Sequence, residues 1–266
     1  MNEIVAVRGG GDIATASIHR LHRCGFRVLI LECGAPTAIR RKVAFCEAVY
    51  EGVSTVEGVT ARKVENIENC ETVWNRREIP LLVDETGECL KKLQPHVLVD
   101  GILAKKNLGT TRDMAPLTIA LGPGFEAGVD VDYVIETVRG HNLGRIISKG
   151  CAMKNTGVPG VIAGFGKERV IHSPATGIIK NYSKIGDWVE KDKIIAMIGD
   201  TPVPASLTGL LRGIIRDGFP VKEGLKIADI DPRQSEYENC FTISDKARCI
   251  AGSVLEVILH DMQCIG

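Results

Sequence analysis

The sequence lacks the features that mark several specialised classes of protein. Lys and Arg total 33, as do Asp and Glu, aromatic residues make up 5%, and the nine cysteines include no CxxC pair. The balanced charge predicts neither a nucleic acid nor a membrane surface as a partner. An odd number of scattered cysteines is typical of free thiols in a reducing cytoplasm, and it indicates neither a disulfide framework nor a zinc site.

Long apolar runs are also missing. No stretch of about 18 apolar residues occurs, so we expect no membrane-spanning helix. The first residues, MNEIVAV, contain no basic region ahead of a long apolar one, so we expect no signal peptide. Together these features predict a cytoplasmic location.

Short apolar runs do occur, and helical or loop segments separate them. The strand-like runs are EIVAVR (3–8), RVLILE (27–32), IPLLVD (79–84), HVLVDGIL (96–103) and LTIALG (117–122). Ile13, Ser17 and Leu21 recur at helical spacing between the first two runs. This alternation predicts a Rossmann-like, mostly parallel α/β sheet domain over residues 1–168. The polar region 33–73, which is punctuated by valines, is expected to add short strands at the periphery of the sheet.

The pattern changes after residue 168, where short Ile, Val and Leu runs are broken by Gly, Asp and Pro. We predict a small all-β domain over 169–233. It contains an internal repeat, because a shift of 32 residues superimposes 176–198 on 208–230. Identical residues meet at Thr176, Gly177, Gly186, Val189, Ile195, Ala196 and Ile198. Two such copies are expected to close on each other as a pseudo-twofold barrel.

The remaining segment, 234–266, predicts a C-terminal helix that packs back on the α/β domain. Ser244 or Asp245 is suited to cap it. An apolar stripe follows at Ala247, Ile250, Val254, Val257 and Ile258.

Six runs spread over nearly the whole chain carry a family resemblance. They are PTAIRRKVAFCEAVYEG (36–52), DGILAKKNLGT (100–110), ALGPGFEAGVDVDYVIETVRGHNLGRI (120–146), NTGVPG (155–160), KIADIDPR (226–233) and ISDKARCIAGSVLEVIL (243–259). Together they resemble the YqeB-type accessory proteins of selenium-dependent molybdenum hydroxylase systems. The resemblance implies a cytoplasmic role in maturing such a hydroxylase and a distant kinship to xanthine dehydrogenase accessory factors, which carry a Rossmann-like domain. It implies no catalytic residues.

The repeat region resembles a second group, the biotinyl/lipoyl carrier domains, also called barrel-sandwich hybrids. Those domains present a modified lysine on the hairpin that joins their two halves. Here the corresponding hairpin, IGDTPVPASL (198–207), contains no lysine. The resemblance therefore implies the carrier fold without the carrier chemistry.

A glycine-rich turn follows the first predicted strand. Gly9, Gly11 and Ala14 fit the pattern GxGxxA, and Glu32 ends the next strand, where a ribose acceptor is expected. One interpretation is that backbone N–H groups and the helix N-terminus bind a phosphate. The other is a sharp turn that uses glycines for geometry alone. Asp12 favours caution, because its charge repels a phosphate at the helix start.

Further candidates follow other predicted strands. Arg40 and Arg41 follow the second predicted strand. One interpretation is that they bind a phosphate or carboxylate, and the other is that they form a solvated surface pair. The LAKKNLGT loop suits an anion such as a nucleotide or pterin phosphate, or is an exposed basic turn. LGPGFEAG allows close backbone approach to a ligand, and ETVRGHNLGR adds charged residues and a histidine. The candidate ligand-binding residues are Gly9, Gly10, Gly11, Asp12, Ala14, Glu32, Arg40, Arg41, Lys105, Asn107, Gly122, Gly124, Arg139 and His141.

Two cysteines and two histidines are weaker candidates for functional residues. Cys33 and Cys151 suit a low-pKa thiolate relay, although buried inert cysteine is the commoner fate. His19 and His22 lie three residues apart, and we expect a solvated helix face there rather than metal ligation.

Three hypotheses follow, and no metal is predicted. The first is an accessory protein that binds a nucleotide or molybdopterin-type cofactor and docks a molybdenum hydroxylase or another maturation factor. The second is an NAD(P)-dependent oxidoreductase. The third is a non-catalytic protein-binding module in which the β domain is the active part.

Overall fold

The chain divides into two compact units. The computed structural model describes residues 3–155, 157 and 160–265. Unit 1 comprises Met1–Pro36, Ala44–Asn155 and Ile243–Gly266, and unit 2 comprises Thr37–Val43 and Thr156–Thr242. These bounds differ from the expected domains, since the first boundary lies near 155 rather than 168 and the short segment 37–43 joins unit 2.

Segment 37–43 joins unit 2 through pairing with a distant strand. The Ile214 N–H donates to the Ile39 carbonyl at 2.9 Å, and Arg41 Nε donates to the Ile214 carbonyl at 2.9 Å. Pairing between residues so far apart in the chain leaves no local pattern, which is why sequence reasoning missed it.

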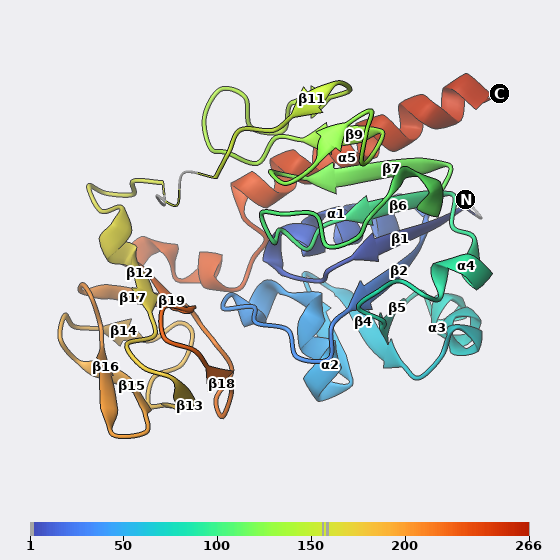
Figure 1. The fold of residues 1–266 in the computed structure, drawn as a ribbon. Coiled ribbons are helices and arrows are strands. Elements are labelled where there is room, and N and C mark those ends of the chain that lie inside the picture. The colour runs from blue at the N-terminus through green and yellow to red at the C-terminus, as the bar shows by residue number, and fades with distance from the viewer. Residues whose placement is uncertain (1–2, 156, 158–159, 266) are drawn as a thin grey trace. The chain divides into compact units, whose positions relative to one another are not determined.

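Unit 1 alternates strands and helices (Figure 1). Its elements are β1 (Ile4–Arg8), α1 (Asp12–Arg23), β2 (Arg27–Glu32), α2 (Ala48–Glu51), β3 (Val53–Val56), β4 (Val59–Val64), α3 (Cys70–Asn75), β5 (Ile79–Val83), α4 (Leu90–Leu93), β6 (Val97–Asp100), β7 (Leu117–Leu121), β8 (Glu126–Ala127), β9 (Tyr133–Ile135), β10 (Ile146–Ile147), β11 (Gly150–Cys151) and α5 (Asp245–Ile265).

A nine-stranded sheet forms the centre of unit 1, in the order β10-β9-β7-β6-β1-β2-β5-β4-β3. β1 pairs in parallel with β2 on one side and with β6 on the other, so the winding of the chain reverses between β1 and β6. The antiparallel pairs, β3 with β4 and β9 with β10, lie at the two edges. The predicted mostly parallel sheet with short peripheral strands is confirmed.

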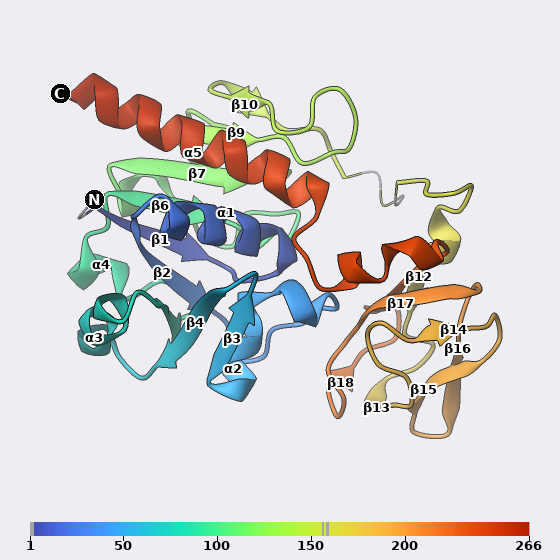
Figure 2. The ribbon, with the colours of Figure 1, turned by 180° about the vertical axis from the view of Figure 1, so that it is seen from behind.

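Helices cover both faces of this sheet, which explains why its strands are apolar at successive positions. α1 and α5 lie over one face (Figure 2). On the other face, Cys70 of α3 and Leu90 of α4 pack with Ala6, Leu29 and Leu98 of the strands.

α5 begins as the sequence predicts. Ser244 Oγ accepts the Ala247 N–H at 3.2 Å, which is the N-cap hydrogen bond, and the helix runs from Asp245. Ile250, Val254 and Ile258 of the expected apolar stripe are fully buried. α5 packs along α1 within unit 1.

The paired strands of unit 2 are antiparallel. They are β12 (Val170–His172), β13 (Gly177–Asn181), β14 (Trp188–Val189), β15 (Ile194–Ile198), β16 (Thr201–Pro204), β17 (Gly209–Ile214), β18 (Pro220–Val221) and β19 (Lys226–Asp231). They form two four-stranded sheets, β12-β19-β17-β14 and β16-β15-β13-β18.

The sequence repeat is confirmed as a structural repeat. A shift of 32 residues carries β12–β15 onto β16–β19, and it exchanges the two sheets. β13 pairs with β18, and β17 pairs with β14. Each sheet therefore contains two strands from each copy. The equivalent residues Ile195 and Ile227 are both buried in one shared core, so neither copy buries its apolar face alone. The β15–β16 hairpin that joins the copies exposes Gly199 and Asp200.

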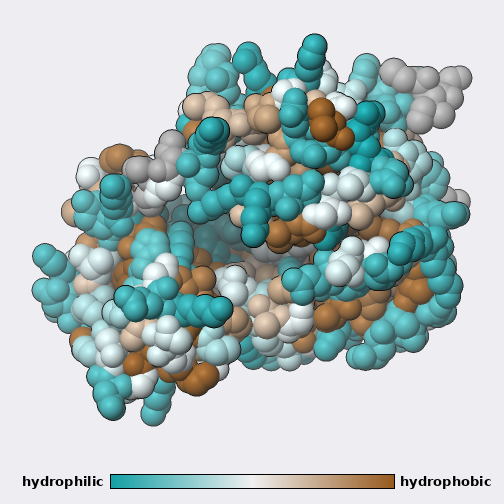
Figure 3. All heavy atoms as spheres, viewed as in Figure 1, coloured by the Kyte–Doolittle hydropathy of each residue, from teal (hydrophilic) through white to brown (hydrophobic). Residues whose placement is uncertain are grey.

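The surface mixes polar and apolar side chains. On the face drawn in Figure 3, hydrophilic and hydrophobic residues are interspersed over both units. Within the described residues, no helix combines the length and the apolar character that crossing a membrane requires.

Candidate functional site

The glycine turn connects β1 to α1 at the carboxyl edge of the sheet. Gly9 has φ of 91°, and a Cβ added there would come within 3.0 Å of the Gly101 backbone after β6. A Cβ on Gly10 would meet the Cys46 backbone N at 3.0 Å. Both glycines are therefore required for close packing of the chain on itself.

Glu32, the expected ribose acceptor, is occupied by the turn. Its carboxylate accepts the Gly10 N–H at 2.7 Å and the Cys33 N–H at 2.9 Å. The side chain thus fixes the position of the glycine turn against the end of β2. Ribose binding would have to share a carboxylate that already holds two backbone donors.

A short segment after β2 covers part of the turn. The Cys46 N–H donates to the Gly10 carbonyl at 2.9 Å, and the Phe45 N–H donates to Thr15 Oγ1 at 3.0 Å. Gly11 differs from its neighbours, because a Cβ there would meet no atom within 4 Å. Its φ of −65° suits any residue. The N-terminus of α1 is therefore open at Gly11.

A buried polar cluster that sequence reasoning missed lies where β1 and β6 end. Thr110 Oγ1 accepts from Arg8 Nη1 at 2.5 Å and donates to Asp100 Oδ2 at 2.6 Å. Arg8 and Asp100 lie 3.9 Å apart and are almost fully buried. Burial raises the pKa of Asp100, although Thr110, the Ile102 N–H and Arg8 act in the opposite sense. Arg8 Nε has no hydrogen-bond partner among the described residues.

A sequence signal for this cluster exists. Arg8 and Asp100 each end an apolar run and directly precede a glycine. A charged residue at the carboxyl end of a buried parallel strand lies where open α/β sheets bind ligands.

The loops after β6 and β7 contact each other. A Cβ on Gly124 would come within 2.6 Å of Lys106 Cα. Lys105 is exposed and has a positive φ of 65°. Asn107 is occupied within its own loop, because Oδ1 accepts the Gly109 and Thr110 N–H groups at 2.8 Å and Nδ2 donates to the Thr110 carbonyl at 2.8 Å.

Gly122 and Glu136 stabilise the adjacent strand ends. A Cβ on Gly122 would come within 2.6 Å of Thr137 Oγ1. Glu136 is buried, and its carboxylate accepts the N–H groups of Thr137, Val138 and Met153 at 2.7 to 2.8 Å. Its role in this arrangement is to hold the chain after β9.

Arg139 pairs with the start of α5, and His141 is exposed. Both Arg139 Nη atoms donate to the Asp245 carboxylate at 2.8 Å. The hydrogen bond to Asp245 raises the pKa of Arg139. His141 is exposed in the following turn. Of the two candidates in the ETVRGHNLGR motif, the structure thus pairs Arg139 with α5.

Lys246 is a second residue that sequence reasoning missed. It is half-buried at the start of α5. Burial and the charge of Arg139 lower its pKa, whereas Asp12, Glu136 and Asp245 act in the opposite sense. No hydrogen bond or close ion pair engages its ammonium group within the described part of the chain. Its place in the first turn of an amphipathic helix gave no signal in the sequence.

Arg40 and Arg41 lie in unit 2, and the glycine turn lies in unit 1. Arg40 Nη2 donates to the carbonyls of Asn239 and Thr242 at 2.9 and 3.0 Å, and Arg41 Nε donates to the Ile214 carbonyl. Arg40 is also buried. The interpretation as a solvated surface pair is therefore wrong for Arg40, because its guanidinium packs among backbone carbonyls of its own unit.

The weaker candidates behave differently from one another. Burial and then Glu32 raise the pKa of Cys33 to about 11, so it is a protonated thiol near neutral pH and does not match a low-pKa relay. Cys151 is exposed. The expected solvated face is wrong for His19, which is buried with its ring 3.4 Å from the Glu57 carbonyl. Burial also lowers the pKa of His22.

Comparison with curated proteins identifies a relative. The chain is 50% identical over 258 residues to the protein named "Uncharacterized protein YqeB" of Escherichia coli (strain K12). The chain is a relative of YqeB. The alignment covers 97% of this chain and 48% of YqeB, so the chain spans about half the length of that curated relative. No family model matches the chain.

Comparison with solved structures gives weak similarities. The product-bound ectoine utilization protein EutE (DoeB) of Ruegeria pomeroyi is 11% identical, with 86% of this chain and 85% of that chain covered and a TM-score of 0.26. An aspartoacylase family protein of Mesorhizobium loti is 8% identical, with 86% and 85% covered and a TM-score of 0.27. Similarities of this size establish neither a common fold nor a common function.

Proposed function

We propose that this relative of YqeB is a cytoplasmic accessory protein for the maturation of a selenium-dependent molybdenum hydroxylase, and that unit 1 binds a nucleotide- or molybdopterin-like ligand at the turn Gly9–Ala14. The six sequence motifs and the similarity to YqeB support the family context. The role of the whole protein, its hydroxylase partner and its ligand are part of the proposal.

The observation that carries the ligand site is the open N-terminus of α1 at Gly11. It lies at the carboxyl edge of the sheet, beside the point where the winding reverses between β1 and β6. Ligands of open α/β sheets bind at such points, and an N-terminal helix end favours an anionic group. Asp12 opposes an anion there, and the ammonium of Lys246, on which Asp12 acts electrostatically, offsets that charge.

The same geometry gives less support to an NAD(P)-dependent oxidoreductase. That hypothesis relied on Glu32 as the acceptor for a ribose hydroxyl. Glu32 instead holds the Gly10 and Cys33 N–H groups. The histidine and the thiol that the sequence offers for this chemistry do not support it: His141 is exposed, and Cys33 has a raised pKa.

We propose further that unit 2 is a barrel-sandwich hybrid that serves in docking rather than in carrier chemistry. The exchange of strands between its two repeats supports this architecture. The hairpin at Gly199 and Asp200 offers no lysine for modification. Exposed Ile178 and Trp188 provide apolar contacts of the kind that partner surfaces use.

Copurification tests the proposal as a whole. The protein is purified from cells that make the hydroxylase, and mass spectrometry identifies copurifying small molecules and proteins. We expect a pterin or nucleotide together with the hydroxylase or another maturation factor. Absence of both kinds of partner from the purified protein would contradict the proposal.

A further inference from the structure

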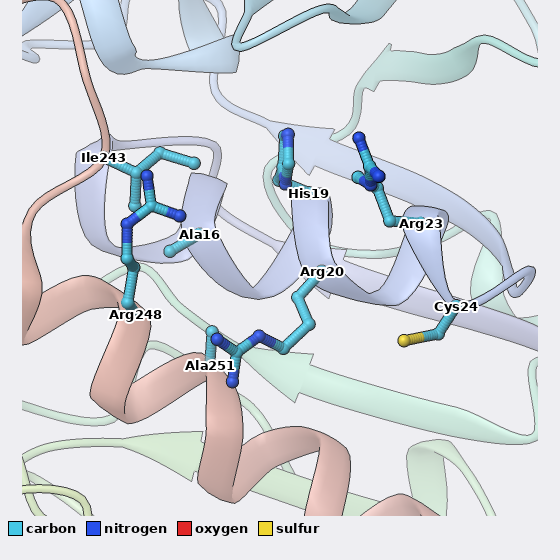
Figure 4. Close-up of a pocket in the computed structure, with 8 residues that line it drawn as sticks. All are labelled: Ala16, His19, Arg20, Arg23, Cys24, Ile243, Arg248 and Ala251. Atoms are coloured by element: carbon cyan, nitrogen blue, oxygen red, sulfur yellow. The ribbon is translucent and has the colours of Figure 1, made fainter.

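A cavity lies between α1 and α5 (Figure 4). Its volume is about 200 Å³, and its walls include Arg20, Arg23 and Arg248, together with His19 and Cys24. In Figure 4 the side chain of Arg20 extends from α1 towards α5, and Arg248 extends from α5 towards α1. We call this cavity the guanidinium pocket.

The positive charge of the pocket is only partly balanced. Arg248 Nη2 donates to both carboxylate oxygens of Glu57 at 2.6 and 2.9 Å, so that guanidinium is paired. The guanidinium groups of Arg20 and Arg23 have no hydrogen bond or ion pair to any other described residue. Burial lowers the pKa of His19, and the charges of Arg23 and Arg248 lower it further. A neutral imidazole therefore lies beside two unpaired guanidinium groups.

We propose that the guanidinium pocket binds a small phosphate-type oxyanion. Guanidinium groups bind phosphate oxygens through paired N–H donors. Arg20 provides such a group on the α5 side of the pocket without losing an existing partner, and Arg23, which extends with His19 on the other side of α1, adds positive charge at the rim (Figure 4). The C-terminal end of a helix opposes an anion with about half an elementary charge, which is less than the two unpaired positive charges. Arg20 is also supported by α5, because a Cβ on Gly252 would come within 2.8 Å of its Nη1.

The size of the cavity restricts the ligand. The volume of the cavity is about 200 Å³. Pockets for drug-sized ligands begin near about 300 Å³. The pocket therefore fits inorganic phosphate or pyrophosphate, and it is too small to enclose a whole nucleotide or pterin.

The pocket is separate from the site at Gly11. Arg20 lies nine residues along α1 from Gly11, which corresponds to about 14 Å along the helix axis. The oxyanion site therefore stands independently of the proposed maturation role, and a substitution at Gly11 leaves it unchanged.

Protection of Cys24 from alkylation tests the proposal on the full-length protein. Cys24 lines the pocket and is exposed, and Cys151 is an exposed internal reference outside the pocket. Labelling by neutral iodoacetamide is followed by mass spectrometry with and without pyrophosphate, at ionic strength matched with sodium chloride. We expect saturating pyrophosphate to slow Cys24 labelling at least fivefold while Cys151 is unaffected.

Paired variants identify the residues responsible. R20Q/R23Q should lose the protection of Cys24 and bind pyrophosphate at least tenfold more weakly by calorimetry. The control R76Q/K222Q removes the same amount of positive charge from two exposed residues outside the pocket, and it should behave as wild type. Unchanged Cys24 labelling in the wild type, or full protection in R20Q/R23Q, would overturn the proposal. G11A should keep the wild-type protection of Cys24. This result would show that the oxyanion site does not depend on the proposed ligand site at the glycine turn.

Discussion

At the residue scale, the glycine turn is defined as much by its polar neighbours as by its glycines. Glu32 holds the Gly10 N–H, and the Arg8–Asp100–Thr110 cluster lies beneath the same strand ends. Of the three glycines, Gly11 alone would carry a Cβ into open space. In the glycine-rich turn, Gly9 and Gly10 are therefore needed for close packing, and Gly11 leaves open space at the N-terminus of α1.

Thr110 should be essential to the buried cluster, because its hydroxyl joins Arg8 to Asp100. Replacing it in T110V removes both hydrogen bonds and leaves buried polar atoms unpaired. We expect the free energy of unfolding to fall by about 1–3 kcal/mol in urea titrations. The control T111V affects only an exposed hydroxyl that contacts Asp113 and should change stability little. A loss in the free energy of unfolding that is no larger in T110V than in T111V would contradict a stabilising role of the cluster.

Cys33 should react as a thiol rather than as a thiolate at neutral pH. Its pKa is raised to about 11 by burial and by Glu32. Iodoacetamide labelling of Cys33 should therefore accelerate about tenfold per pH unit from pH 7 to 10, because the thiolate is the nucleophile. In E32Q the labelling curve should shift to lower pH. A rate that levels off below pH 8 would contradict this assignment.

At the scale of elements, α1 and α5 form a layer whose stability depends on pH. Burial lowers the pKa of His19 on α1 below the value of about 6.5 in the unfolded chain. A histidine whose pKa is lower in the folded chain than in the unfolded chain binds more protons when the chain is unfolded. Its contribution to stability is therefore complete above about pH 6.5 and is lost as the pH falls through the pKa of the folded chain.

We therefore expect the midpoint of thermal unfolding to fall between pH 7.5 and pH 5, and to fall less steeply in H19Q. Circular dichroism at a series of pH values measures both. H141Q, which changes an exposed histidine, is the matched control and should keep the wild-type slope. A wild-type slope in H19Q would contradict the assignment.

The two repeats of unit 2 are equivalent in topology but not in packing. A Cβ on Gly209 would collide with the Asp231 carbonyl oxygen, whereas one on the equivalent Gly177 would meet Cγ2 of the Ile198 side chain at 3.0 Å. Backbone yields less readily than the end of a side chain. G209A should therefore lower the unfolding midpoint more than G177A, and the reverse order would contradict the structure.

At the scale of the whole molecule, local patterns predicted most of the fold. The five apolar strands of unit 1 (β1, β2, β5, β6 and β7), the cap at Ser244 and the 32-residue repeat are encoded in short stretches of sequence, and the structure contains all of them. Segment 37–43 was assigned to the wrong unit, because its pairing with Ile214 is formed only in the folded chain. Lys246 was missed for the same reason, since its significance depends on Asp12 and Arg139 from distant segments. Arg8 and Asp100 had a local signal at the ends of two apolar runs, but their pairing through Thr110 is formed only in the folded chain.

The measurement that bears most directly on the proposed ligand site is a calorimetric titration of wild type and G11A. ADP and dihydroneopterin triphosphate serve as nucleotide and pterin-phosphate probes. G34A is the control, because its added methyl group would make only an ordinary contact with Val83 at 3.9 Å. We predict micromolar binding of one probe by wild type and G34A, and at least tenfold weaker binding by G11A with an unchanged unfolding midpoint. Equal affinity in G11A, or no binding of either probe by the wild type, would contradict a ligand site at the glycine turn.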